Sequence, residues 1–323
     1  MNKVAGKNVA IASGIICILL AISLVGAIAN YTSIISAKDN TITSQDSTIK
    51  NLNTKIKAQL QTIVFHVSEK GEEYPYAQLP NATQTYNQIQ ALNNNTYEIV
   101  LLPEYKGNLN WPQELNWIAT NFGGPQGIPI MLDVFGGGED HTPTPMLTTE
   151  DVTAAKAVAN VKYLRFAEVM SWHLENKQPF PTNYVAETLE FCKTNNLKLF
   201  WTEWKNDYPD KNVETFTAIQ SYIKGYEDTV TVSFSTNSHE LEPTDGFLQL
   251  NQMFQQWGAS IQPWYWNTTR NSDLMDMPAS LLLEHALSAK GIGAKIIEFE
   301  PYWYFFDNGE PNTNLKLLLT MLT

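Results

Sequence analysis

From about residue 62 to the end of the chain, hydrophobic and polar positions alternate between two patterns, one typical of strands and one typical of helices. Short runs rich in β-branched and aromatic residues predict strands. There are eight of these runs: 62–68, 97–103, 127–135, 161–168, 197–203, 229–236, 260–267 and 294–301. Longer segments between and after them carry the apolar spacing of helices. These segments are 77–94, 111–122, 148–161, 183–196, 213–227, 245–259, 277–291 and 312–322.

Regular alternation of strand and helix predicts a parallel sheet with crossover helices. Eight strand and helix pairs within residues 62–323 are the pattern of a (β/α)8 TIM barrel, an α/β fold. A doubly wound open sheet is the alternative, but such sheets usually carry a glycine-rich phosphate loop after an early strand. Neither GxGxxG nor GxxxxGK(S/T) occurs, and the three glycines at 136–138 are too compact for either motif. The barrel is therefore the expected fold.

The N-terminal segment has a different pattern, with Lys3 and Lys7 followed by a long uncharged stretch. Its apolar centre, residues 9–29, is long enough to cross a bilayer. The two lysines are expected to stay cytoplasmic, which places the barrel on the outer side of the cell membrane. A small-x-small tripeptide ends at Ala29, so a secreted chain cleaved there is the alternative to an uncleaved signal anchor. The length of the apolar region favours the anchor.

Residues 31–61 form a polar stretch in which isoleucine recurs every seventh residue. These isoleucines are Ile35, Ile42, Ile49 and Ile56. The spacing is that of a coiled-coil seam and predicts a helical stalk. Lys38, Gln45 and Gln59 occupy the second seam position, so self-association through the stalk is expected to be weak, and a single polar spacer helix is the alternative. The expected organisation is an anchor at 1–30, this stalk, and a barrel at 62–323.

A formal charge of −12 and a pI near 4.9 narrow the range of partners. Nucleic acid and anionic lipid surfaces would be repelled, so a neutral ligand is favoured. Cys17 and Cys192 are the only cysteines, which leaves no internal disulfide framework. Sequons for N-glycosylation are compatible with an exported glycoprotein. They begin at Asn30, Asn81, Asn94 and Asn267.

Polar and aromatic residues gather where the predicted strands end. In a barrel the active site lies at this end of the strands, so these residues are the candidates for function. Indole faces stack on the apolar faces of pyranose rings, while carboxylates and amides bind sugar hydroxyls, so a glycan is the expected ligand. The residues expected to bind it are His66, Asp133, Arg165, Trp201, Trp204, Trp264, Tyr265, Trp266, Asn267, Glu298, Glu300, Tyr302 and Trp303.

Two of the strand-end glutamates carry a resemblance to a known group of enzymes. Glu168 ends the fourth predicted strand and Glu203 the fifth, and with its aromatic mouth the chain resembles the (β/α)8 glycoside hydrolases over residues 62–323. Families of that group with glutamates on strands four and seven usually have Asn before the first glutamate. Here Ala167 holds that place, and the seventh strand at 260–267 has no carboxylate. The amylase-like arrangement on strands four and five maps instead onto Glu168 and Glu203.

This resemblance implies that Glu168 and Glu203 are the catalytic pair of a glycosidase. Neighbouring strands lie about 4.8 Å apart, which suits the roughly 5 to 5.5 Å between the carboxyl groups of a retaining enzyme. Trp201 and Trp204 favour Glu203 as the protonated acid, and Arg165 favours Glu168 as the ionised partner. One departure is that amylase-like enzymes use Asp as the nucleophile, with Arg two residues before it rather than three.

Other chemistries have less support in the sequence. The histidines are dispersed without metal-ligand spacing, so neither a metal nor a cofactor is expected. They are His66, His141, His173, His239 and His285. No GxSxG motif occurs, and Lys205 is the only lysine near a predicted strand end that could form a Schiff base. A wider pair of Glu168 with Glu298 or Glu300 would suit an inverting enzyme. A non-catalytic carbohydrate-binding barrel is the alternative from another class of protein.

Overall fold

The computed structural model describes the strands of the barrel, most of its helices, and scattered positions before it. The described ranges are 61–68, 82–93, 96–104, 128–136, 160–204, 209–236, 244–261, 279–300, 305–307 and 310–322, with single positions or short stretches between 24 and 42. Contacts divide the chain into two compact units, Met1–Gln59 and Leu60–Thr323.

In the first unit, the described positions between residues 24 and 42 are helical. Two expected seam residues, Ile35 and Ile42, have side chains that are more than half exposed. Across the described residues, no helix is both long enough and apolar enough to cross a membrane. The anchor predicted at 9–29 falls outside the described residues apart from Leu24, so it stays a prediction.

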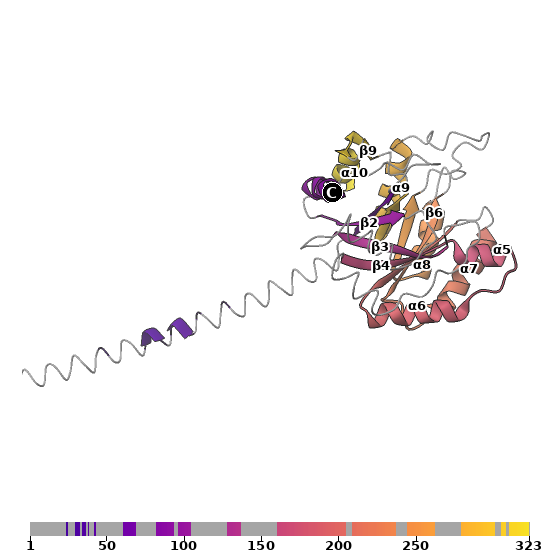
Figure 1. Cartoon of the computed structure of the whole chain (residues 1–323), viewed down its shortest axis with the longest axis horizontal. Helices are drawn as coiled ribbons and strands as arrows, with labels where there is room; N and C mark the ends of the chain where they lie inside the picture. The colour runs from indigo at the N-terminus through magenta and orange to yellow at the C-terminus, as the bar shows by residue number, and fades with distance from the viewer. Residues whose placement is uncertain are drawn as a thin grey trace, which may run out of the picture. The chain divides into compact units, whose positions relative to one another are not determined.

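Eight parallel strands close into a barrel in chain order (Figure 1), which confirms the predicted fold class. They are β1 (Thr62–Ser68), β2 (Glu98–Glu104), β3 (Pro129–Gly136), β4 (Asn160–Ala167), β5 (Lys198–Trp204), β6 (Val230–Thr236), β7 (Trp257–Ile261) and β8 (Ile296–Phe299). The barrel closes between its first and last strands, where Thr62 pairs with Ile296 and Phe65 with Phe299. All eight strands are parallel, so their C-terminal ends share one rim.

The seventh strand differs most from its prediction. It runs from Trp257 to Ile261 rather than over 260–267, because α8 (Thr244–Met253) ends earlier than the helix expected at 245–259. Small residues such as Gly258 gave little sign of a strand. All five residues of β7 are nevertheless buried, since the barrel interior and the helix layer cover both faces. The other predicted strands agree with the observed bounds within about two residues at each end.

The remaining helices surround the barrel (Figure 1). They are α2 (Ala82–Asn93), α5 (Val169–Glu175), α6 (Thr182–Thr194), α7 (Pro209–Tyr222), α9 (Ala279–Ile292) and α10 (Thr313–Leu322). The short hairpin of β9 (Phe306–Asp307) and β10 (Glu310–Pro311) precedes the last helix. The sequence did not predict α5, which follows β4 after a single residue, Glu168. The helices expected at 111–122 and 148–161 lie outside the described residues.

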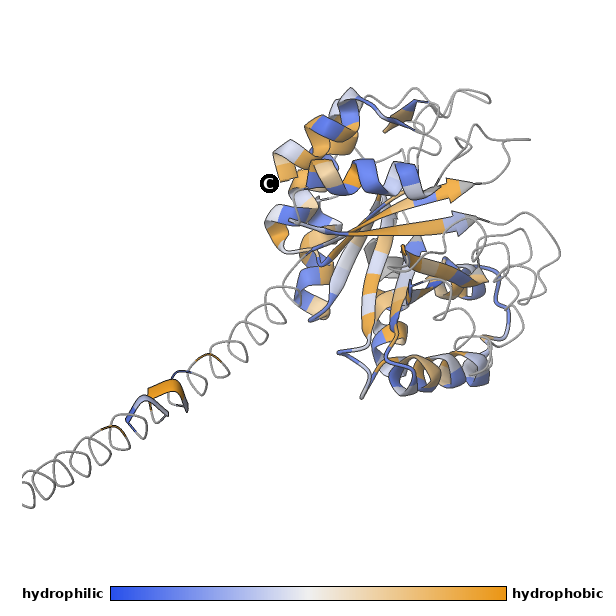
Figure 2. Ribbon diagram, turned by 60° about the vertical axis from the view of Figure 1, so that its left-hand side comes forward, coloured by the Kyte–Doolittle hydropathy of each residue, from blue (hydrophilic) through white to orange (hydrophobic). Residues whose placement is uncertain are grey.

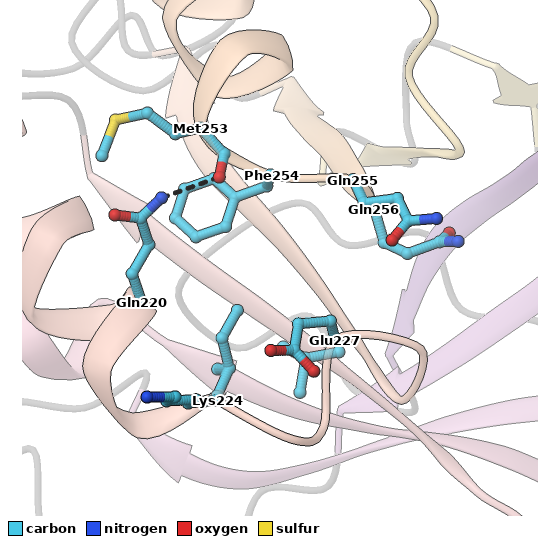
Figure 3. Close-up of a pocket in the computed structure, with 9 residues that line it drawn as sticks. Gln220, Lys224, Glu227, Met253, Phe254, Gln255 and Gln256 are labelled. Atoms are coloured by element: carbon cyan, nitrogen blue, oxygen red, sulfur yellow. Dashed lines mark hydrogen bonds between the residues drawn. The ribbon is translucent and has the colours of Figure 1, made fainter.

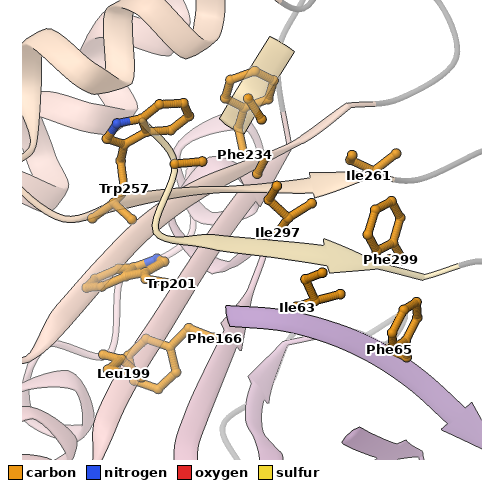
Figure 4. Close-up of a cluster of buried hydrophobic side chains, with 14 of the residues drawn as sticks. Ile63, Phe65, Phe166, Leu199, Trp201, Phe234, Trp257, Ile261, Ile297 and Phe299 are labelled. Carbon is orange, nitrogen blue, oxygen red and sulfur yellow. The ribbon is translucent and has the colours of Figure 1, made fainter. Parts of the chain in front are cut away.

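Alternation of side chains along each strand produces two separate cores. The outer core packs between strands and helices, and Figure 4 shows part of it around Trp201, Phe166 and Phe299. Figure 2 shows that the strands are largely apolar, whereas the helices carry both polar and apolar residues. The inner core fills the barrel with Val64, Val100, Leu102, Met131, Tyr163, Phe200 and Ile296. These two sets show which strand residues point inward, and so which strand-end side chains reach the mouth.

A polar network lies inside the barrel near the start of the strands. Tyr163 Oη donates to Glu98 Oε2 at 3.0 Å, and Thr62 Oγ1 lies 3.1 Å from Tyr163 Oη. Lys162 pairs with the same carboxylate. Burial, followed by the charge of Glu98, raises the pKa of Tyr163, so its hydroxyl stays a donor. This network satisfies the polar groups at the end of the barrel opposite the strand-end glutamates.

A close contact between neighbouring strands depends on Gly258 in β7. A Cβ at this position would lie 2.7 Å from the Ile296 carbonyl oxygen and 3.0 Å from Phe200 Cε2. Gly258→Ala is therefore expected to destabilise the barrel by about 1 to 3 kcal/mol. The matched control is Gly291→Ala in α9, where no atom lies within 4 Å of the new Cβ. Urea unfolding should show a lower midpoint for the first variant only, and equal midpoints would contradict this account.

His285 in α9 is expected to make the fold sensitive to acid. Its side chain is buried, neither ring nitrogen has a hydrogen-bond partner among the residues that the structure describes, and burial lowers its pKa to about 4. A histidine with a lowered folded pKa destabilises the fold as pH falls below its unfolded pKa, about 6.5. His285→Leu should raise the free energy of unfolding at pH 5 by about 2 kcal/mol more than at pH 7.5. Denaturation at both pH values measures this difference, and an equal effect at both would contradict it.

Candidate active site

Four of the predicted site residues form a connected ionic network inside the barrel. Arg165 on β4 places its Nε 2.7 Å from Glu298 Oε1 on β8 and its Nη1 2.9 Å from Asp133 Oδ2 on β3. His66 Nε2 on β1 lies 2.7 Å from the same oxygen of Glu298. Arg165, His66 and Glu298 are buried, whereas the Asp133 side chain is 30% exposed. Asp133 is therefore the more exposed of the two carboxylates in this network.

The network holds Glu298 in its ionised form. Burial alone would raise the pKa of this carboxyl, but the charges of Arg165 and then His66 outweigh it and lower the pKa to about 2. A hydrogen bond from Ser260 on β7 acts in the same direction. A fully buried carboxylate needs partners of this kind, because an isolated charge would be strongly disfavoured. Glu298 is thus an anion at any physiological pH.

Glu168 follows β4 directly and has the opposite electrostatic character. Its carboxyl accepts a hydrogen bond of 3.4 Å from Ser235 Oγ on β6. Burial raises its pKa, the charge of Arg165 opposes this, and the charges of Glu298 and Asp133 add to the increase. The influence of these three groups shows that Glu168 faces the same ionic network. A carboxyl group with a raised pKa beside ionised carboxylates can donate a proton.

Glu203 faces the other side of the sheet, which corrects the expected pair. On β5 it alternates in phase with Leu199 and Trp201, both of which belong to the outer core. Its two carboxylate oxygens accept hydrogen bonds from Met170, Ser171 and Trp201, not from groups inside the barrel. Glu168 and Glu203 therefore do not line one pocket, although their strands are neighbours. Of the two carboxyl groups, Glu168 is the one that faces the ionic network inside the barrel.

Of the aromatic residues and the last glutamate that were expected to bind a glycan, the structure describes only the side chains of Trp201 and Glu300. Trp201 is fully buried in the outer core and packs edge-on against Phe166 with ring centroids 5.2 Å apart, so it is not available for stacking on a sugar. Glu300 follows β8 with the same phase as Glu298 and is half-buried. The side chain of Trp204 lies outside the described residues. So do Trp264, Tyr265, Trp266, Asn267, Tyr302 and Trp303, whose expected contacts with a glycan stay predictions.

Two serines contact the glutamates of the site: the sequence analysis missed Ser260, whereas Ser235 lies at a predicted strand end but was not among the residues expected to bind a ligand. Ser235 on β6 and Ser260 on β7 touch the two glutamates of opposite character. The sequence feature that could have identified these serines is their position in the strand alternation. Each alternates with apolar residues that pack outward, such as Phe234 and Ile261, so each serine side chain points into the barrel. The same reasoning would have placed Glu203 outside the barrel.

A cavity at the other end of the barrel is separate from this site. It has a volume of about 270 Å³ and lies where α7 and α8 end and β6 begins (Figure 3). Gln220 Nε2 donates to the Met253 carbonyl oxygen across it at 2.7 Å, and Lys224, Glu227 and Gln256 add polar groups at its edge. Active sites of barrels lie at the opposite rim, so this cavity is not a candidate active site.

Metal ligation has no candidate in the part of the chain that the structure describes, where no group of three His, Cys, Asp or Glu side chains could hold an ion. His66, the histidine of the network, contacts Glu298. The described carboxyl groups of the network and Glu168 are suited to proton transfer and electrostatic stabilisation.

No protein-family model and no curated protein matches the sequence. Among solved structures, an archaeal fructose 1,6-bisphosphate aldolase is similar with a TM-score of 0.49 and 9% identity, over 82% of this chain and 94% of the aldolase. The dihydropteroate synthase of Xanthomonas albilineans has a TM-score of 0.46 and 10% identity, over 81% and 92%. The 3-dehydroquinate dehydratase of Geobacillus kaustophilus has a TM-score of 0.45 and 11% identity, over 81% and 91%.

These three neighbours are barrel enzymes but not glycosidases. At such identities and TM-scores their chemistry is not transferred to this chain. The function has to be argued from the residues of the site itself.

Proposed function

We propose that the barrel is a glycoside hydrolase in which Glu168 is the proton donor and Asp133 the ionised carboxylate that meets the substrate. The observation that carries this proposal is the meeting of carboxyl groups of opposite character at one rim. Burial raises the pKa of Glu168, whereas Asp133 and Glu298 are ion-paired with Arg165. Glycosidases need one protonated and one ionised carboxyl at the bond that breaks.

The chemical step follows from these roles. Glu168 gives its proton to the glycosidic oxygen as the bond from that oxygen to the anomeric carbon breaks. Asp133 stabilises the positive charge that develops on the sugar, and water then adds its hydroxyl group to the anomeric carbon while its remaining proton returns to the Glu168 carboxylate. Glu298 stays buried beneath Arg165 and fixes the guanidinium that orients Asp133. His66 holds the outer side of the Glu298 carboxylate.

Charge at the rim favours a neutral glycan over a phosphorylated or uronic one. Arg165 is the described arginine or lysine in the network, and two carboxylates already contact it. Glu300, directly after β8, adds a further acidic group. Among the described residues of the network, an anionic sugar would meet these carboxylates and would be repelled. The aromatic residues at 264–266 and 302–303 are proposed to supply the stacking surfaces.

We also propose that the barrel acts outside the cell membrane, held there by the segment at 9–29. The support comes from the sequence, which has lysines before an apolar stretch of bilayer length. Fractionation of cells that produce the full chain, followed by N-terminal sequencing, tests this proposal. Membrane-bound protein with its first residues intact would support it, whereas protein that starts just after Ala29 would show a cleaved signal.

The function is tested with the full chain and a panel of neutral oligosaccharides and polysaccharides. New reducing ends measure hydrolysis, and glycan-array binding is measured in parallel. Cleavage of at least one neutral glycan supports the proposal. Binding without cleavage across the panel would favour the non-catalytic carbohydrate-binding alternative, for which the fully ion-paired state of Glu298 and Arg165 is the supporting observation. Cleavage of phosphorylated sugars alone would contradict the charge argument.

A further inference from the structure

Glu203 is a fully buried carboxylate that binds the first turn of α5. Its Oε1 accepts from the Met170 N–H at 2.8 Å and from Trp201 Nε1 at 2.6 Å. Its Oε2 accepts from the Ser171 N–H at 2.9 Å and from Ser171 Oγ at 2.5 Å. Both oxygens are thus occupied by donors, and three of the four donors belong to α5. The carboxylate fixes where this helix begins relative to β5.

The start of α5 determines the conformation of Glu168. This residue is the single link between β4, which ends at Ala167, and α5, which begins at Val169. Its φ of 60° and ψ of 24° are left-handed, a conformation that disfavours a residue with a side chain by roughly 1 to 2 kcal/mol. The Glu168 N–H donates to the Thr202 carbonyl oxygen at 2.7 Å, and the Glu168 carbonyl oxygen accepts from the Trp172 N–H at 3.2 Å. The backbone of Glu168 is therefore hydrogen-bonded to β5 through its N–H and to α5 through its carbonyl oxygen.

We propose that Glu203 is a positioning residue, which holds α5 against β5 so that Glu168 is kept in its left-handed conformation with its carboxyl directed at Ser235. The catalytic part of this inference rests on the proposed function of Glu168, but the geometric part does not. Ser171 takes part in the same hydrogen-bond network, because its Oγ contacts Glu203 Oε2 and also lies 3.4 Å from the Glu168 carbonyl oxygen. Backbone strain of this kind persists only where surrounding structure enforces it.

The energetics of Glu203 indicate a role beyond stability. Burial raises its pKa to about 7, although four hydrogen bonds act in the opposite direction. A carboxyl whose folded pKa is raised reduces stability once pH exceeds its unfolded pKa, near 4.5. A neutral residue would cap the helix without this penalty. A buried titratable group that is kept at a cost to stability, and that hydrogen-bonds the helix next to the strained Glu168, fits a positioning role.

The test measures the titration of Glu168 directly. The full chain is labelled with 13C at glutamate side-chain carboxyls, and the Glu168 signal is identified by its loss in Glu168→Gln. In Glu203→Gln the midpoint of Glu168 should fall by at least about one pH unit, because a released carboxyl becomes solvated. Where hydrolysis is measurable, kcat should fall about 100-fold with little change in KM, since the proton donor is misplaced.

The matched control is Glu98→Gln, which removes another hydrogen-bonded carboxylate at the opposite end of the barrel and should leave the Glu168 midpoint unchanged. If Glu203→Gln does not fold, Ser171→Ala removes one donor to Glu203 and should lower the midpoint in the same direction by a smaller amount. A folded variant with an unchanged Glu168 midpoint overturns the proposal. Because the midpoint is read without substrate, an absence of hydrolysis would count against the proposed function and not against this inference.

Discussion

Glu168→Gln is expected to lower glycan hydrolysis at least about 100-fold, the usual scale of a lost general acid. Glutamine has nearly the same shape but cannot give a proton to the glycosidic oxygen. Stability should change little, because the native carboxyl is already disfavoured in its charged form by burial. Initial rates of reducing-end formation, with KM determined separately, measure the effect. Thermal unfolding of the same samples shows whether the variant is folded.

The control for this prediction is Glu175→Gln, which changes an exposed carboxyl at the end of α5. It should keep wild-type activity. The wild-type rate should also decline at high pH as Glu168 loses its proton, and its raised pKa places this decline above the ordinary range for glutamate. Full activity in Glu168→Gln would exclude this residue as the proton donor.

Arg165→Met is expected to destabilise the barrel by about 3 to 5 kcal/mol, the scale found when one partner of a buried ion pair is removed. The variant leaves Glu298, which is fully buried, and Asp133 without the guanidinium that they share. Urea unfolding at pH 7 measures the loss. Replacing Glu298 with glutamine in the same chain should recover part of it, because the uncompensated charge is then absent.

The pH dependence of this loss has a definite sign. The folded pKa of Glu298 is about 2, below its ordinary value of 4.5, so its ionised form adds stability above pH 4.5 that is lost as pH falls towards 2. Without Arg165 this pKa rises, and the penalty of the variant should shrink as the pH is lowered. A penalty independent of pH would contradict the assignment of the network.

Lys162→Met provides the control on the same strand. Lys162 pairs with Glu98, but its side chain is 38% exposed, so its loss should cost no more than about 1 kcal/mol. A loss as large as that of Arg165→Met would show that the effect comes from β4 in general and not from the buried ion pair.

Much of the fold could be predicted from local sequence. Strands buried on both faces read as short apolar runs, and the spacing of those runs leaves room for one helix each. Prediction failed at β7, where Gly258 and Ser260 interrupt the apolar run, and at α5, where the chain enters a helix directly from Glu168. In both places a neighbouring element decides the local structure: Ile296 closes against Gly258, and Glu203 binds the start of α5.

The sequence could predict which residues lie near strand ends, but not which of their side chains lie together. Four of the residues at predicted strand ends, His66, Asp133, Arg165 and Glu298, are joined in the structure through ion pairs and hydrogen bonds. Position along a strand does not tell which face a side chain takes, and a shift of one residue exchanges the two faces. Glu203 was assigned to the mouth for this reason, although its phase with Trp201 places it outside.

The sequence by itself therefore determined the closed parallel barrel, because burial of apolar runs and helix periodicity are local properties of the chain. Only the tertiary structure decided which acids act together. The pKa of a carboxyl depends on charges and solvent within a few ångströms, and those neighbours come from strands far apart in sequence. Closure of β8 onto β1 brings Glu298 next to His66. The charge of Arg165 then helps to keep Glu298 ionised, whereas burial raises the pKa of Glu168.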